Sequence, residues 1–107
     1  MEKEEIIEGI LYLLQGTAQT FLQIREFLKL NKIQGYSEDE KSSIQKLKQL
    51  LREMEEKKLI EERHFDEKYN GRVDYALEQN GIDLIEKKRK EVKTKSIKLE
   101  NKWKLLD

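Results

Sequence analysis

The sequence contains no cysteine and no proline, and it has one histidine and one tryptophan among its 107 residues. Without cysteine, the chain can form neither a disulfide bond nor a thiolate metal site. A Ser-His-Asp type of catalytic arrangement would depend on the single histidine, His64. The absence of proline, together with only five glycines, favours long uninterrupted helices.

The residues that remain do not indicate catalysis. The five glycines stand apart from one another, so no glycine-rich phosphate loop is present. The carboxylates lie in charged runs, where we do not expect burial to raise a carboxyl pKa. His64 falls in a predicted strand beside Leu77, where a packed or rim role is expected rather than that of a base. We therefore predict that the protein is not an enzyme and that it has no catalytic residue, no metal site and no cofactor.

A chain of 107 residues is long enough for one domain with a small core. Charged residues make up 41% and hydrophobic residues 36%, which suits a helical protein that buries further surface as a dimer. The first five residues are acidic rather than a basic leader, and no apolar run approaches the length of a membrane span. We expect a cytoplasmic protein that does not enter a membrane.

The first third of the chain predicts two helices. The first runs from Glu2 or Lys3 to Leu14 and is so densely apolar that we expect burial from two sides. The second covers roughly residues 20–32, with Arg25 and Lys29 four residues apart on its outer side. These two cations are candidates for phosphate contacts, and ordinary solvated charges are the equal alternative.

A third helix is predicted over residues 38–58. Ser37, followed three residues later by Glu40, matches a capping box and predicts the start of this helix. Apolar residues recur at intervals of three and four and predict one buried stripe, which also takes in Lys58. The members of this stripe are Ile44, Leu47, Leu50, Leu51, Met54 and Lys58.

The other side of the third helix is a local basic face on a chain of zero net charge. From Lys41 to Arg52 there are four basic residues and no acidic residue. Lysine and arginine neutralise phosphates, while glutamine, serine and arginine can contact base edges in the major groove. A solvated helix face is the alternative interpretation. The candidate DNA-binding residues of this helix are Lys41, Ser42, Gln45, Lys46, Lys48, Gln49 and Arg52.

A β-hairpin follows the third helix. Residues 59–65 and 72–77 are rich in strand-forming residues, and they flank Asn70-Gly71, a pair that tolerates the positive φ of a tight turn. A tight turn places His64 opposite Leu77, whereas a bulged turn places Phe65 opposite Tyr75. We favour the tight turn. The hairpin tip then offers Lys68, Asn70 and Arg72 to DNA, although Asp66, Glu67 and Asp74 weaken the local positive field.

Two segments resemble the winged-helix regulators of the PadR type and, as a second choice, of the MarR type. Residues 50–60 (LLREMEEKKLI) are similar to the L-x-x-L-E-x-x-G-L-I end of the recognition helix in these regulators. Residues 75–85 (YALEQNGIDLI) are similar to their Y-x-L-T-x-x-G-x-x-L return from the wing to the last helix. Lys58 departs from the usual glycine and Glu78 from the usual threonine. The resemblance covers roughly residues 5–105 and implies a winged helix-turn-helix fold that binds double-stranded DNA.

The last part of the chain predicts a helix that runs to the end. Its apolar residues alternate at spacings of three and four, which is the heptad pattern of a coiled coil. We therefore predict residues 1–81 as the winged-helix domain and residues 82–107 as a dimerisation element. A single helix folded over its own domain is the alternative, and the narrow apolar face argues against a membrane-surface helix. The predicted dimer interface consists of Ile82, Ile85, Val92, Leu99, Trp103 and Leu106, with Arg89 and Ser96 also in the seam.

Taken together, the sequence predicts a mostly α protein with a small β-hairpin (α+β), built as a winged helix-turn-helix with a long C-terminal dimerisation helix. The predicted function is sequence-specific binding of double-stranded DNA by a homodimeric transcriptional regulator. The helix 38–58 would enter the major groove and the 60–77 hairpin would act as the wing. Nothing in the sequence indicates a small-molecule effector.

A protein-interaction adaptor that does not bind DNA is the alternative function, because the net charge is zero and acidic residues surround the wing. A continuous positive band through Lys41, Lys48, Arg52 and Arg72 would favour DNA binding. Acidic side chains that interrupt this band would favour the adaptor.

Overall fold

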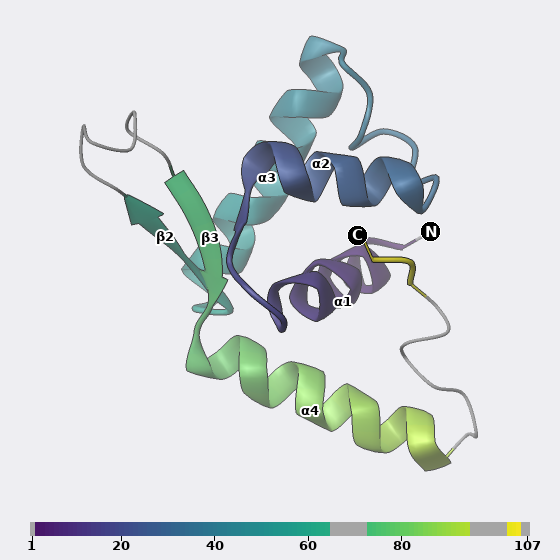
Figure 1. Ribbon diagram of the computed structural model, residues 1–107, viewed down its shortest axis with the longest axis vertical. Helices are drawn as coiled ribbons and strands as arrows, with labels where there is room; N and C mark the ends of the chain where they lie inside the picture. Colours follow the sequence, from purple (N-terminus) through teal and green to yellow (C-terminus); the bar gives the residue numbers. More distant parts are fainter. Residues whose placement is uncertain (1, 65–72, 95–102, 106–107) are drawn as a thin grey trace.

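The computed structural model describes residues 2–64, 73–94 and 103–105. This part of the chain forms four helices and a three-stranded antiparallel sheet, in agreement with the predicted mostly α fold (Figure 1). The elements in chain order are α1 (Lys3–Leu14), β1 (Gln19–Thr20), α2 (Phe21–Leu30), α3 (Lys41–Glu56), β2 (Ile60–His64), β3 (Val73–Leu77) and α4 (Gln79–Thr94).

Helix α1 is the centre of the core. Eight of its twelve residues are buried, and it packs against α2, β3 and α4, which confirms the expectation of burial from more than one side. In Figure 1, α1 lies between α2 above and α4 below. Helix α1 therefore contributes to stability rather than to a surface that a ligand could reach.

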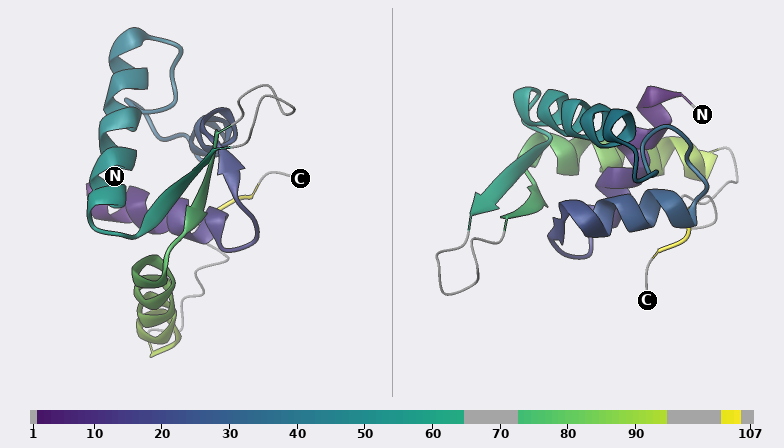
Figure 2. Two further views of the ribbon diagram at one scale, coloured as in Figure 1. Left: turned by 90° about the vertical axis from the view of Figure 1, so that its left-hand side faces the viewer. Right: turned by 90° about the horizontal axis from the view of Figure 1, so that it is seen from above.

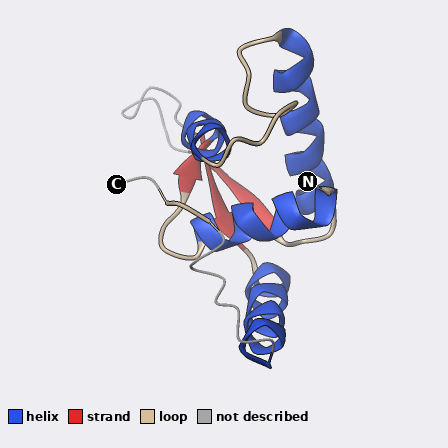
Figure 3. Ribbon diagram, turned by 90° about the vertical axis from the view of Figure 1, so that its right-hand side faces the viewer, coloured by secondary structure: helices blue, strands red, loops and turns tan. Residues whose placement is uncertain are grey.

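The sheet has the strand order β1-β3-β2, and its three strands lie among the helices (Figure 3). The short strand β1, which the sequence did not predict, adds to the outer edge of β3 through the pairs Gln19–Tyr75 and Thr20–Asp74. Two residues are too few to give an alternating pattern, so the sequence carried no signal for it. Strand β1 ties the start of α2 to the hairpin.

Both predicted hairpin registers are wrong. His64 pairs with Val73 rather than with Leu77, and the opposite end of the ladder pairs Ile60 with Leu77. This register places the buried Ile60 beside Leu77, which packs against the core, and such burial outweighs the local preference of an Asn-Gly turn. Tyr75 pairs with Glu62, so the bulged register with Phe65 opposite Tyr75 is wrong as well, while Asn70-Gly71 lies outside the described residues.

Helix α3 begins at Lys41, three residues later than predicted, and no side chain caps its N-terminus. The predicted capping box is wrong because its residues bond elsewhere. The hydroxyl of Ser37 donates to the carbonyl of Ile33 at 2.7 Å. The Glu38 carboxylate accepts from the backbone N–H of Gly35 at 2.9 Å and from the Ser43 hydroxyl at 2.9 Å. These bonds, the Gly35 bond first, lower the pKa of Glu38 and fasten the loop to the first turn of α3.

The end of α3 is a tight left-handed turn. Lys58 has a φ of 58°, its N–H donates to the Glu55 carbonyl, and the Leu59 N–H donates to the Met54 carbonyl. This is the Schellman pattern, in which glycine is preferred at the left-handed position. Lys58 is exposed at this turn, so its predicted place in the buried stripe is wrong. The stripe itself is confirmed at Leu47, Leu50, Leu51 and Met54.

The prediction that the last helix runs to the end of the chain is wrong, because α4 ends at Thr94 and residues 103–105 are not helical. Trp103 is 3% exposed and packs on Phe27, with 5.6 Å between the ring centroids. Asn31 fixes the next residue, since its amide exchanges hydrogen bonds of 2.8 and 2.9 Å with the backbone of Lys104.

The tail of residues 103–105 therefore closes one end of the core, at the end away from the sheet (Figure 1). Two residues of the predicted coiled-coil seam are thereby accounted for within one chain. Trp103 fills space over Gly9 in α1, and Ile85 in α4 is fully buried. Ile82 is half-buried, while Leu99 and Leu106 lie outside the described residues, as does the side chain of Val92. Among the described residues, no helix has the length and apolar character that a bilayer crossing requires.

Candidate nucleic-acid interface

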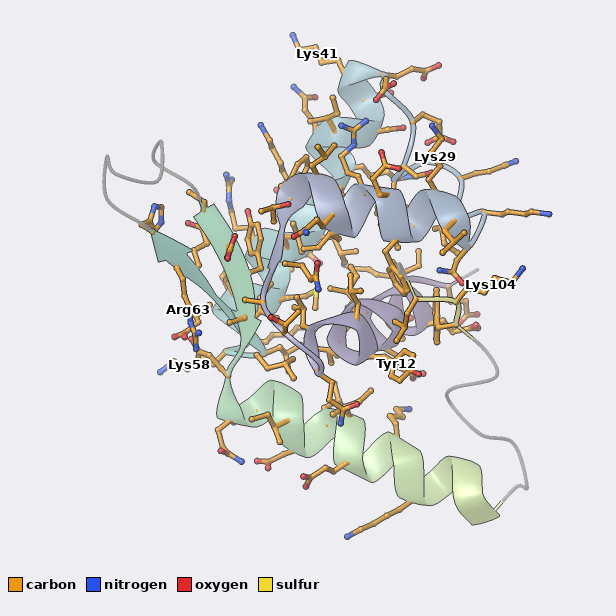
Figure 4. All side chains as sticks on the ribbon, in the orientation of Figure 1. Tyr12, Lys29, Lys41, Lys58, Arg63 and Lys104 are labelled. Carbon is orange, nitrogen blue, oxygen red and sulfur yellow. The ribbon has the colours of Figure 1, made fainter. Side chains whose placement is uncertain are left out.

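The outer face of α3 carries four exposed cations and no acidic residue between Lys41 and Arg52. All seven candidate residues of this helix are exposed: Lys41, Ser42, Gln45, Lys46, Lys48, Gln49 and Arg52. Its four cations form no ion pair with another described residue. Lys41 lies at the far end of α3 and points away from the body of the protein (Figure 4). The positive charge of these four side chains is therefore available to an anionic partner.

Two aromatic rings position the lysines of this face. The ammonium of Lys46 lies 5.1 Å from the centre of the Tyr36 ring, and that of Lys48 lies 5.9 Å from the centre of the Phe21 ring. Cation–π contacts of this length hold an amine without neutralising its charge. Between the aligned side chains of Gln45, Lys48, Gln49 and Arg52 is an open hollow of about 220 Å³. This row of amide and cationic groups can meet both phosphates and base edges.

The acidic residue directly after Arg52 is paired with the core helix. Glu53 forms an ion pair with Lys3 of α1, and this contact lowers the pKa of Glu53 and raises that of Lys3. The pair joins the C-terminal half of α3 to the start of α1. As a result, Glu53, one of the acidic residues that flank the basic run, is paired with α1 and does not face the candidate interface.

Helix α2 supports α3 but offers fewer free cations than predicted. The guanidinium of Arg25 is largely buried, forms an ion pair with Asp39 and donates to the carbonyl of Glu38 at 3.2 Å. It therefore fixes the loop before α3 and is not available for a phosphate. Lys29 remains exposed. Thr20 and Gln23 form a capping box at the start of α2, with reciprocal bonds of 2.8 and 3.2 Å.

Helix α3 and strands β2 and β3 diverge from the turn that joins α3 to β2 (Figure 2). The proposed wing residues Lys68, Asn70 and Arg72 lie outside the described residues, so the positive band cannot be followed to them. At the end of β2, His64 is exposed and its Nε2 lies 3.0 Å from Glu62 Oε2, so it is a surface residue rather than a packed one.

Sequence reasoning missed an acidic pair where α3 meets the sheet. Glu55 of α3 and Glu62 of β2 line a hollow of about 190 Å³ together with Tyr75 of β3, Lys48, Leu51 and Arg52. Burial and then the neighbouring Glu62 raise the pKa of Glu55 to about 7. Burial also raises the pKa of Tyr75 to about 12.

The expectation that no carboxyl pKa would be raised by burial is therefore wrong at Glu55. The two glutamates are seven residues apart and on different elements, so only the packing of β2 against α3 brings them together. No local pattern in the sequence carries that information. In the described residues, no group of three or more histidine, cysteine or acidic side chains is arranged to hold a metal ion.

A helical pair α2–α3 followed by a β-hairpin, with a third strand beside it and helices on both flanks, defines the winged helix-turn-helix class. In this class of fold, the exposed polar face of the second helix is available to a ligand, and in this protein that helix is α3.

Comparison with known proteins places the fold within this class. A PadR family transcription regulator from hypervirulent Clostridium difficile R20291 is similar in structure, with a TM-score of 0.63 and 26% sequence identity. The match covers 85% of this chain and 90% of that one. No protein-family model and no curated protein sequence matches. The chain is thus a PadR-like winged-helix protein, as the segments 50–60 and 75–85 predicted.

Proposed function

We propose that this protein is a transcriptional regulator that binds specific double-stranded DNA sequences, with α3 in the major groove and the β2–β3 hairpin as the wing. The observation that carries the proposal is the row of exposed cations and amides on α3, held over a buried stripe on the opposite side. The similarity to a PadR family transcription regulator supports it. Phosphate contacts from Lys41, Lys46, Lys48 and Arg52 would supply most of the affinity, and Ser42, Gln45 and Gln49 would address base edges.

The proposal includes a homodimer formed through α4, so that two copies of α3 reach neighbouring major grooves. Since Ile85 and Trp103 are buried within one chain, the proposed interface relies on the other predicted residues, Ile82, Val92, Leu99 and Leu106. Size-exclusion chromatography with light scattering tests this part. A mass of one chain at micromolar concentration would contradict it.

The DNA proposal is tested by selecting bound fragments from a random-sequence duplex pool with the purified protein. We expect an enriched motif, and a palindrome if the protein binds as a dimer. The double variant Lys48→Glu/Arg52→Glu should bind the selected duplex about 100-fold more weakly, because two phosphate contacts become repulsive. Affinity of the unchanged protein should fall steeply with salt, and a flat salt titration would contradict a phosphate-based mechanism.

A matched control separates the α3 face from overall charge. Lys32→Glu/Lys104→Glu makes the same change in net charge at two exposed lysines, one after α2 and one in the tail. This variant should bind within about threefold of the unchanged protein, because long-range charge is largely screened at moderate salt. An equal loss in both double variants would show that net charge, and not the α3 face, governs binding.

One observation keeps the adaptor function as a second candidate. Glu55 and Glu62 lie beside Lys48 and Arg52, so acidic side chains border the basic face on the side of the wing. An anionic border of this kind weakens attraction to phosphates and suits a protein partner with mixed charges. If the selection yields no motif and no duplex binds even at low salt, the adaptor function is favoured.

A further inference from the structure

The hollow between α3 and the sheet brings together two carboxyl groups, those of Glu55 and Glu62. Oε1 of Glu55 is buried, and no donor among the described residues forms a hydrogen bond with it. Its neighbour is the carboxyl of Glu62. Two carboxylates repel each other, whereas a single proton shared between them forms a hydrogen bond and removes that repulsion.

The groups around the pair come from three elements. Helix α3 contributes Lys48 and Arg52, and strand β2 contributes His64 beside Glu62. Strand β3 contributes Tyr75, whose hydroxyl donates to Glu62 Oε1 at 3.5 Å. Strand β1 places the uncharged Gln19 opposite Tyr75. Burial and then the neighbouring Glu62 oppose the ionised form of Glu55, whereas the nearby cations favour it, and together they bring the pKa of Glu55 to about 7.

The pair is adjacent to the candidate interface, because Lys48 and Arg52 line both the hollow that contains the pair and the hollow on the outer face of α3. DNA phosphates that approach these two cations would add negative charge close to Glu55 and Glu62. Such a charge makes the protonated form of the pair more favourable than it is in the free protein.

We propose that DNA binding by the α3 face takes up one proton, held between the side chains of Glu55 and Glu62, so that affinity rises as the pH falls from 8 to 6. This inference rests on the proposed DNA-binding function and adds its regulation. By linkage, a complex that holds more protons than the free protein binds less tightly as the pH rises. The pair thereby tunes a site whose border is acidic at high pH and closer to neutral at low pH.

The test is the affinity for the selected duplex, measured by fluorescence anisotropy between pH 6 and pH 8 at constant ionic strength. We expect binding to be about fivefold tighter at pH 6 than at pH 8, as the uptake of up to one proton allows. Glu55→Gln should bind at pH 8 about as tightly as the unchanged protein does at pH 6, with little dependence on pH. Glu62→Gln should give the same flat profile, and it repeats the test should Glu55→Gln fold poorly.

Two variants on β2 separate the pair from its surroundings. Glu61→Gln removes a carboxylate that is paired with Arg63 at 2.9 Å, so the pH dependence should remain. His64→Gln removes the imidazole whose Nε2 lies 3.0 Å from Glu62 Oε2, and the pH dependence should again remain. If His64→Gln abolishes the pH dependence while Glu55→Gln retains it, the inference is overturned.

Failure of the inference differs from failure of the proposed function. If the protein binds the duplex with an affinity that does not change between pH 6 and pH 8, the proton uptake is wrong and the DNA-binding function stands. If no duplex binds at low salt at any pH, either to the unchanged protein or to Glu55→Gln, both are overturned.

Discussion

The end of the molecule closed by Trp103 and the face formed by α3 differ in what their side chains contact. Eight of the twelve residues of α1 are buried, and Trp103 of the tail packs over Gly9 and Phe27. On α3, five of sixteen residues are buried and seven candidate contact residues stand in water. The two regions meet through the stripe on α3 and the Lys3–Glu53 pair. Stability and binding should therefore respond to different substitutions.

The largest expected effect lies at the closed end. Trp103→Ala should lower the free energy of unfolding by about 3 to 4 kcal/mol, because it removes a large buried ring and leaves a cavity beside Phe27 and Gly9. Urea unfolding followed by far-ultraviolet circular dichroism measures this loss. The affinity of the folded protein for its duplex should change by less than about twofold.

Leu105→Ala is the control for Trp103, because this neighbour is 46% exposed and its truncation should cost at most about 0.5 kcal/mol. An unchanged unfolding midpoint in Trp103→Ala, combined with dissociation of a dimer, would contradict the intramolecular role. That outcome would mean that Trp103 packs between two chains, as the heptad pattern predicted.

Gly9→Ala sharpens the same comparison with a smaller effect. A Cβ at Gly9 would lie 2.6 Å from the Trp103 ring, closer than packed atoms approach. Alanine usually favours a helix over glycine by up to about 1 kcal/mol, yet here the clash should reverse the sign and cost about 1 to 3 kcal/mol. Thermal or urea unfolding measures the difference.

Two companion variants test the cause of that loss. Gly16→Ala meets nothing within 4 Å, so it should be neutral or slightly stabilising. In a Trp103→Ala background, Gly9→Ala should no longer destabilise the protein, since the ring that it would meet is gone. If the cost of Gly9→Ala persists in that background, the tail is not what occupies the space above Gly9.

The contrast also explains which features could be predicted from sequence. The exposed face of α3 and the burial of α1 follow from helical periodicity, which is local, and both are confirmed. The hairpin register, the return of Trp103 and the Glu55–Glu62 pair depend on contacts between distant residues. For the first two of these features a local pattern pointed elsewhere: Asn70-Gly71 to a tight turn, and the heptad spacing of Trp103 to a coiled coil. Tertiary burial decided the outcome, and no single-sequence pattern encodes it.

The smallest expected effect is at Lys58, where the α3 face is joined to the wing. Lys58 occupies a left-handed conformation with a φ of 58°. It stands at the position where the motif that residues 50–60 resemble usually has glycine. Lys58→Gly should raise the free energy of unfolding by about 0.5 to 1 kcal/mol, because glycine adopts this conformation without the steric cost of a Cβ.

Lys57→Gly is the matched control for that change. Lys57 is also an exposed lysine, but its φ of −82° suits an ordinary residue, so glycine there should destabilise the protein by about 0.5 to 1 kcal/mol. Opposite signs at two adjacent lysines with the same change in charge would assign the effect to backbone conformation alone. A loss of stability in both variants would mean that the Lys58 side chain contributes more than its strained backbone costs. The departure from the glycine pattern would then be a stabilising feature of this chain, at the turn that sets the angle between α3 and the wing.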